Sequence, residues 1–254
     1  RQRQMCIRDR IIAVPTAIKV YNWVLTLWRG NIKTTVPMLF AIGFVFTFIN
    51  GGLTGLFLGN VTIDLPLSDT YFVVAHFHMV VAVSPVLVVF GSIYHWYPKI
   101  TGRMYNDTMA RIHFWCTFVG SYAIYYPMHY LGIQGMPRRY FSYGETEFIS
   151  AGSGDLNAAI SVAAIFVAVS QIFFFVNIIG SLFRGEKADP NPWDATTLEW
   201  QTPQTPPGHG NFDDLPLVYR WAYDYSVPGY EQDFIPQNVS PAESERMAKR
   251  IEKA

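Results

Sequence analysis

The chain has 254 residues, of which 50% are hydrophobic, 16% are aromatic and only 15% are charged, and its formal net charge is zero. An average soluble domain carries about 25% charged residues, so this composition favours a membrane protein. The neutral balance argues against a nucleic-acid partner, which needs a basic face. Cys6 and Cys116 lie far apart and give neither a disulfide framework nor a zinc site.

The first ten residues are highly charged and directly adjoin an apolar segment. They lack the apolar core and the small-residue cleavage site of a secretory signal peptide. We interpret residues 1–10 as foreign to the protein and leave them out of the fold prediction.

About five apolar segments follow, each close to the ~20 residues that a membrane-spanning helix needs. They run approximately over residues 11–28, 36–58, 71–97, 112–130 and 157–183. The sequence therefore predicts an all-α membrane protein with a transmembrane bundle over residues 11–184 and an extended tail over residues 185–254. Aromatic residues such as Trp193 and Trp200 indicate that the tail docks against another surface, and residues 241–254 predict a short polar helix or a disordered end.

Basic residues gather in the connections on one side of this bundle, at residues 29–33, 99–111 and 184–187. The opposite connection, residues 59–70, carries only Asp64 and Asp69 as charges. The positive-inside rule then places the basic side and the tail in the cytoplasm or the matrix. Arg138 and Arg139 fall on the outer side against this rule, so we expect them to have a local anionic partner.

His76 and His78 carry the most informative chemistry. Two residues at i and i+2 on a helix point about 200° apart, so they cannot share one metal as an i, i+4 pair does. They can instead bind two centres on opposite faces of the helix, with Phe77 between these centres. Neutral imidazole is a good iron ligand inside a membrane. The alternative is a pair of histidines that form hydrogen bonds within the bundle or line an aqueous cavity.

Lys19 lies about nine residues, or ~13 Å, from the basic end of the first segment. A lysine stem does not reach that far, so its amine stays at a depth where ionisable groups are costly and usually functional. Thr16 presents a hydroxyl on the same helix face. The alternative is a lysine that faces a wet crevice.

Residues 70–78, Thr-Tyr-Phe-Val-Val-Ala-His-Phe-His, closely resemble the helix X signature of the subunit I family of cytochrome c oxidases. Further matches follow in order from about residue 11 to residue 200, at residues 14–20, 51–55, 135–140 and 196–200. The resemblance implies that the five segments are helices VIII to XII of a twelve-helix haem–copper oxidase subunit. The chain would then be a C-terminal fragment of an aa3-type, bacterial enzyme in the plasma membrane.

The resemblance also implies roles for individual residues. His76 would bind the iron of the high-spin haem a3, His78 would bind the iron of the low-spin haem a, and Phe77 would pack between the haems. Lys19 and Thr16 match the proton channel that leads to the oxygen site.

On the outer side, Arg138 and Arg139 match arginines that hold haem propionates, which suits the bidentate bonds of arginine to carboxylates. Asp64 is expected near the same propionates. In the family, the residue that matches Asp69 binds magnesium together with a histidine immediately before it, but this chain has Ser68 there. Because serine replaces that ligand, we expect magnesium to be absent or differently bound.

The family implies that the whole subunit reduces O2 to water with electrons from cytochrome c and couples this reaction to proton pumping. Its partners would be subunit II with copper A, subunit III and the lipid bilayer. The copper B ligands and the second ligand of the low-spin haem precede this region in the family. We therefore expect the fragment alone to be inactive.

A quinol oxidase of the same superfamily is the first alternative, and a non-haem bundle whose histidines relay protons is the second. Lys19 and the Pro-Arg-Arg sequence argue against a nitric oxide reductase. The remaining histidines lack neighbours typical of ligands, and we expect structural roles for them: His95, His113, His129 and His209. We expect His95 and His129 to act as anchors at the membrane interface. The many aromatic side chains are interpreted as bulk that faces lipid and packs on haem.

Overall fold

The computed structural model describes residues 2–141, 152–202, 206, 208, 210, 212, 214–222 and 235–251. Within these residues the regular elements are all helices: α1 (Gln2–Leu27), α2 (Val36–Leu58), α3 (Val61–Leu67), α4 (Tyr71–Phe77), the π-helix η1 (His78–Val83), α5 (Ser84–Thr101), α6 (Asp107–Ile133), α7 (Ser153–Arg184), the 3-10 helix η2 (Leu198–Trp200) and α8 (Pro241–Ile251). The predicted all-α class is confirmed. His209 lies outside the described residues.

The chain divides into two compact units. The first comprises residues 1–93 and 107–177, and the second comprises residues 94–106 and 178–254. The histidine pair and both outer arginines belong to the first unit.

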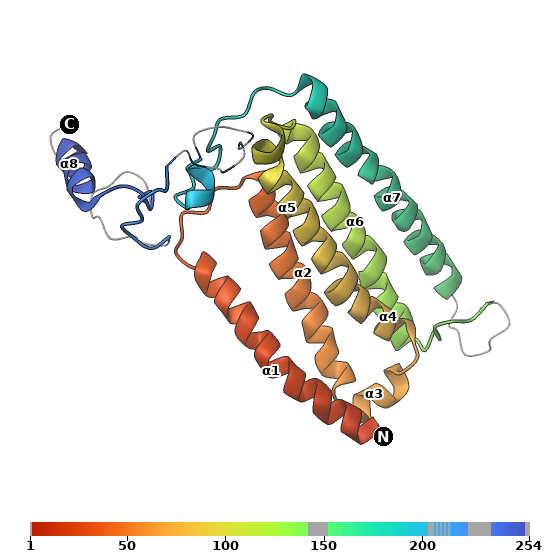
Figure 1. Cartoon of the computed structure of the whole chain (residues 1–254). Coiled ribbons are helices and arrows are strands. Elements are labelled where there is room, and N and C mark those ends of the chain that lie inside the picture. The colour runs from red at the N-terminus through yellow and green to blue at the C-terminus, as the bar shows by residue number, and fades with distance from the viewer. Residues whose placement is uncertain are drawn as a thin grey trace. The chain divides into compact units, whose positions relative to one another are not determined.

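In the first unit, α2 lies between α1 and the rod that α4, η1 and α5 form, and α6 lies between that rod and α7 (Figure 1). Aromatic side chains join α1 to α2: Trp23 packs edge-on against Phe44 and Phe48, with ring centroids 4.9 and 5.5 Å apart. Buried apolar residues of α4, α6, α7 and the segment that follows α6 form a core beside the histidine pair, made of Ala75, Ile124, Met128, Leu131, Met136 and Ile160.

Three of the described helical stretches are long and apolar enough to cross a membrane: Val36–Leu58, Tyr71–Thr101 and Ser153–Arg184. The other two predicted spans are also helical, but α1 is apolar only over Ile11–Leu27, and α6 has a lower mean hydropathy. Asp107, Arg111 and His113 in the first two turns of α6 account for part of this difference. Length and hydropathy alone thus support three of the five expected spans.

The start of α4 is joined to the end of α6. The Tyr71 N–H donates to the Met136 carbonyl at 3.0 Å, and Thr70 forms an isolated bridge with Pro137. A Cβ atom on Gly132 would overlap the backbone nitrogen of Phe72, so only glycine permits this approach of α6 to α4. These contacts fix the segment that carries Arg138 beside the turn that carries Asp69.

The helix changes register immediately after the histidine pair. From His78 to Val83 it is a π-helix, and the Ser84 N–H donates to the Met79 carbonyl five residues earlier. The Ser84 hydroxyl donates to the same carbonyl at 2.6 Å. Pro85 follows and has no N–H to continue the ladder. Single π turns of this kind occur frequently at functional sites.

The connection at residues 59–70, which the sequence predicted only as a loop, contains the short helix α3. Asn60 caps it, because its side-chain oxygen accepts from the Thr62 N–H at 3.1 Å. In the sequence, Asn60 was the available sign that a helix begins here. Pro66 inside the segment concealed it, since proline usually breaks a helix interior.

In the second unit, the tail packs on the end of α5, as its aromatic residues predicted. Trp200 is buried, and the centroid of its ring lies 5.1 Å from that of His95. The Lys99 ammonium lies over the Trp200 ring, 5.0 Å from its centroid. Trp193 stacks on His95 at 5.6 Å and donates to its carbonyl at 3.0 Å. The predicted short polar helix is present as α8.

Candidate functional site

His76 and His78 contact different neighbouring helices. The Nδ1 atom of His76 lies 2.8 Å from the Gly51 carbonyl oxygen and 3.0 Å from the Thr54 hydroxyl, both on α2. The ring of His78 instead stacks on Tyr125 of α6, with centroids 5.2 Å apart and planes inclined by 19°. The structure thus places the two imidazoles on two sides of one helix.

The hydrogen bonds of His76 define which of its nitrogens carries the proton. A backbone carbonyl only accepts, so the contact with Gly51 requires a proton on Nδ1. The Thr54 hydroxyl donates its own proton to the same carbonyl at 2.6 Å, which leaves its oxygen to accept from Nδ1. In the neutral imidazole, the lone pair is therefore on Nε2, the tautomer that a metal ligand needs.

His78 reaches the same tautomer through its own helix. Its Nδ1 lies 2.8 Å from the Val74 carbonyl, one turn earlier, so the proton is again on Nδ1. Nε2 has no hydrogen-bond partner within the part of the chain that the structure describes. Metal-ligating histidines commonly donate their other ring N–H to a carbonyl in this way, which fixes the ring and raises its basicity.

Gly55 determines how closely α2 approaches His76. A Cβ atom at this position would lie 2.7 Å from Cε1 and 3.2 Å from Nε2 of the imidazole. At Gly52, in the same sequence motif, an added Cβ would meet nothing within 4 Å. The packing against His76 therefore requires glycine at position 55 but not at position 52.

A cavity of about 300 Å³ lies beside the helix and is lined by Tyr71, Val74, Phe77, Arg138 and Arg139. Positions 71, 74 and 78 share one face of a helix, so the cavity is on the His78 side. Phe77 is 40% exposed although it is a large apolar residue. Ligand sites typically combine apolar walls with a few polar groups in about 300–1,000 Å³, and this cavity has that character.

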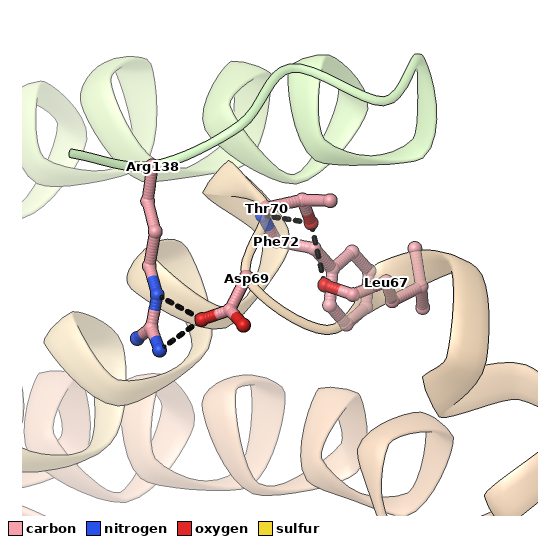
Figure 2. Close-up of polar contacts among 5 residues, drawn as sticks. All are labelled: Leu67, Asp69, Thr70, Phe72 and Arg138. Atoms are coloured by element: carbon pink, nitrogen blue, oxygen red, sulfur yellow. Dashed lines mark hydrogen bonds and ion pairs between the residues drawn. The ribbon is translucent and has the colours of Figure 1, made fainter. Parts of the chain in front are cut away.

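Arg138 pairs with Asp69, as Figure 2 shows. Its Nε lies 2.9 Å from the Asp69 Oδ1, and its Nη2 contacts the same oxygen. Asp69 has a φ of 61°, and Thr70 after it caps α4 by accepting from the Phe72 N–H at 3.2 Å (Figure 2). Arg138 thus has an anionic partner, Asp69, within the chain itself, and the binding of haem propionates by Arg138 and Arg139 stays a prediction.

Arg139 differs from its neighbour. It is exposed, has a φ of 68° and forms no ion pair with any described residue. A positive φ is a strained conformation for a residue with a long side chain. Among the residues that the structure describes, no acidic group forms an ion pair with the positive charge that Arg139 adds to the edge of the cavity.

The residues considered for magnesium do not gather into a metal site. The described residues contain no group of three or more His, Cys, Asp or Glu that could hold a metal ion. One carboxylate oxygen of Asp69 is bound by Arg138, and Ser68 ends α3. Asp64 is half-buried within α3.

Lys19 and Thr16 lie one turn apart on α1. Lys19 is exposed, and the Thr16 hydroxyl donates to the Ile12 carbonyl at 2.9 Å. Both side chains occupy one helix face, as expected from their spacing. Their role in proton transfer stays a prediction.

The described histidines outside the pair form contacts typical of structural residues. His113 is fully buried and hydrogen-bonds to Gln171 of α7 at 3.0 Å. His129 lies against Phe72, with centroids 5.0 Å apart, and its Nδ1 binds the Tyr125 carbonyl at 2.8 Å. It is buried in the bundle, because α4 covers it, where the sequence had suggested an interfacial anchor.

The chain matches the family described as cytochrome c and quinol oxidase polypeptide I over residues 9–166. The protein belongs to this haem–copper oxidase family. The matched range includes the histidine pair, the Gly51–Gly55 motif and both outer arginines.

Two bacterial relatives illustrate the similarity within this oxidase family. The chain is 66% identical to the alternative cytochrome c oxidase subunit 1 of Bradyrhizobium diazoefficiens over 232 residues, 91% of this chain and 39% of that protein. It is 45% identical to cytochrome c oxidase subunit 1 of a Synechocystis species over 217 residues, 85% of this chain and 38% of that protein. The chain thus spans about two fifths of the length of these relatives.

The fold agrees with this assignment. A haem–copper terminal oxidase dimer solved by cryo-EM superposes with a TM-score of 0.53 at 19% identity, covering 61% of this chain and 28% of that chain. Members of this family are membrane proteins that use haem and copper. The all-α membrane class predicted from the sequence is therefore confirmed.

The described residues fit haem. Two half-buried imidazoles carry their Nε2 lone pairs on two sides of one helix, and the cavity beside His78 joins apolar walls to two guanidinium groups. Copper has no comparable ligand group among the described residues. The sequence pointed to both histidines, both arginines and the motif at residues 51–55. It did not predict the contact of Gly55 with His76 or the stacking of Tyr125 on His78, because both depend on packing between helices distant in the chain.

Proposed function

We propose that this chain forms the part of a haem–copper oxidase catalytic subunit that holds the proximal ligand of the high-spin haem, His76, and one axial ligand of the low-spin haem, His78. The whole enzyme would reduce O2 to water with electrons from cytochrome c. The observation that carries this proposal is the pair of opposed imidazoles, each with Nδ1 bound to a backbone carbonyl.

The haem irons, when bound, supply the electron transfer and the oxygen chemistry. The chain orients their ligands: α2 holds the proton on Nδ1 of His76, and the Val74 carbonyl does the same for His78. Phe77, between His76 and His78 in the sequence, would pack between the two haems.

Arg138 and Arg139 would bind the carboxylates of the low-spin haem at the outer end of the cavity. Arg139 has no ion-pair partner among the described residues, whereas Nε and Nη2 of Arg138 both donate to Oδ1 of Asp69. Asp64 lies on the same outer segment and would contribute to this polar region. A magnesium ion at Asp69 would require ligands beyond those that the described residues bring together.

Lys19 and Thr16 would deliver protons from the cytoplasmic side to the oxygen site. This proposal rests on their shared helix face and on the cost of an ionisable group within an apolar segment. Proton pumping, a location in the bacterial plasma membrane with a cytoplasmic tail, and assembly with subunits II and III belong to the same proposal. The names of the relatives favour cytochrome c over quinol as the donor.

The test replaces each histidine by alanine in the assembled oxidase and records reduced-minus-oxidised spectra. We expect His76→Ala to lose the high-spin haem signal and His78→Ala to lose the low-spin signal. His95 of α5, whose ring contacts Trp96 and the tail residues Trp193 and Trp200, provides the control: His95→Ala should keep both signals. Retention of both haem signals in the first two variants would exclude the ligand assignment and favour a non-haem proton relay.

A further inference from the structure

Tyr125 makes a contact with His78 that hydrogen bonding does not explain. The two rings lie 5.2 Å apart with planes inclined by only 19°. Phe77 approaches the same imidazole at 4.3 Å with its plane tilted by 34°. The hydrogen bond from Nδ1 to Val74 fixes one ring atom, and a stacked neighbour then restricts the plane of the ring.

Tyr125 is itself held firmly. It packs against the buried core of the first unit, which includes Ala75, Ile124 and Met128. Its backbone carbonyl accepts from the buried imidazole of His129. The next residue, Tyr126, is 64% exposed and belongs to a different face of α6. The stacked ring is therefore a fixed surface for His78.

We infer that Tyr125 is a positioning residue that sets the plane of the His78 imidazole through ring stacking, and thereby the electronic state of the iron that His78 binds. This inference rests on the proposed assignment of His78 as a haem ligand. The overlap between an imidazole π system and the metal orbitals depends on the plane of the ring, so a neighbour that fixes this plane tunes the metal.

The ring face of Tyr125 carries this role, and its hydroxyl does not. The hydroxyl forms no hydrogen bond with any described residue. Tyr125→Phe keeps the stacked ring and should behave as the unmodified protein. Tyr125→Leu and Tyr125→Met keep apolar bulk but remove the flat face, and the methionine conserves more volume in the core.

The experiment records the electron paramagnetic resonance spectrum and the midpoint potential of the low-spin haem in the purified, assembled oxidase. We expect shifted g values and a shifted potential in the leucine and methionine variants, with normal haem content and an unchanged high-spin haem. Tyr125→Phe should keep the g values and the midpoint potential of the unmodified oxidase. Tyr126→Leu, the matched control, should also leave both unchanged.

Unchanged g values and potential in haem-loaded Tyr125→Leu or Tyr125→Met would overturn the inference. It would also be overturned if neither variant assembled while Tyr125→Phe did, because the ring would then be a part of the core alone. A low-spin haem that persists in His78→Ala identifies a different failure, that of the ligand assignment. The two failures are thus distinguishable.

Discussion

His76 and His78 have different surroundings, although only Phe77 separates them in the sequence. His76 is oriented by α2, through a carbonyl and a hydroxyl that precede it by 25 and 22 residues. His78 is oriented by its own helix and by an aromatic face of α6 beside an open cavity. The orientation of His76 therefore depends on close helix packing, and that of His78 depends on local geometry and stacking. Substitutions on α2 should affect one haem, and substitutions on the opposite side should affect the other.

Gly55→Ala should give the largest effect and should act on His76 alone. Its Cβ would lie 2.7 Å from a ring atom that two hydrogen bonds hold in place. Overpacking of this kind costs about 1–3 kcal/mol. We expect reduced high-spin haem content with the low-spin band retained, measured by visible spectroscopy of the assembled oxidase.

Gly52→Ala is the matched control, because nothing lies within 4 Å of the added atom. It should be neutral or slightly stabilising, since alanine favours a helix over glycine by up to about 1 kcal/mol. Equal loss of high-spin haem in both variants would contradict the proposed difference between the two glycines.

Thr54→Val should give an intermediate effect. Valine keeps the shape of threonine but removes the hydroxyl that lies 3.0 Å from Nδ1 of His76, while the Gly51 carbonyl remains as an acceptor. The loss of one such hydrogen bond costs about 0.5–1.5 kcal/mol. We expect a lower midpoint for thermal loss of the high-spin haem band, with recovery in Thr54→Ser. A larger loss of the low-spin band would show that the two sides are not independent.

Arg139→Gln should act on the opposite side of the helix. Arg139 has no ion-pair partner in the described part of the chain, and removing its positive charge from the edge of the cavity disfavours the reduced, more negative state of a nearby redox centre. The midpoint potential of the low-spin haem should therefore fall in a spectroelectrochemical titration. The double variant Asp69→Asn with Arg138→Gln removes a paired charge of each sign, so its shift should be smaller.

Asp69→Asn should have the smallest effect on stability. The Asp69 side chain is 75% exposed, and exposed ion pairs contribute about 0.2–1 kcal/mol after solvent screening. Asparagine tolerates the positive φ of this position, so the variant isolates the charge. Asp107→Asn, which breaks an exposed pair with Arg111 on α6, is the control for thermal denaturation. A loss of thermal stability well above that of Asp107→Asn would indicate that the ion pair between Arg138 and Asp69 is more than a surface contact.

The sequence was sufficient for the parts of the site that depend on local geometry. The spacing of His76 and His78 required opposed rings, and the apolar segments required helices, whose core ranges agree with the structure. The pairing of Arg138 with Asp69 was not foreseen, because the two residues are 69 positions apart and each had been considered for a different ligand. The stacking role of Tyr125 was equally hidden, since a chain with 15 tyrosines gives no sign of which ring meets a histidine.

The π turn at His78–Val83 has a consequence for any change of chain length in this helix. A π turn holds one residue more than the α-helical turn that it replaces, and each residue of an α-helix rotates the chain by about 100°. Deleting a single residue between His78 and Pro85 would convert this turn to an α-helical one and leave the two ends of the rod in nearly the same rotation, whereas a deletion in an α-helical part of the rod would rotate its two ends by about 100° relative to each other. The π turn is therefore the place in this helix where one residue can be lost without turning the imidazoles of His76 and His78 away from α2 and α6.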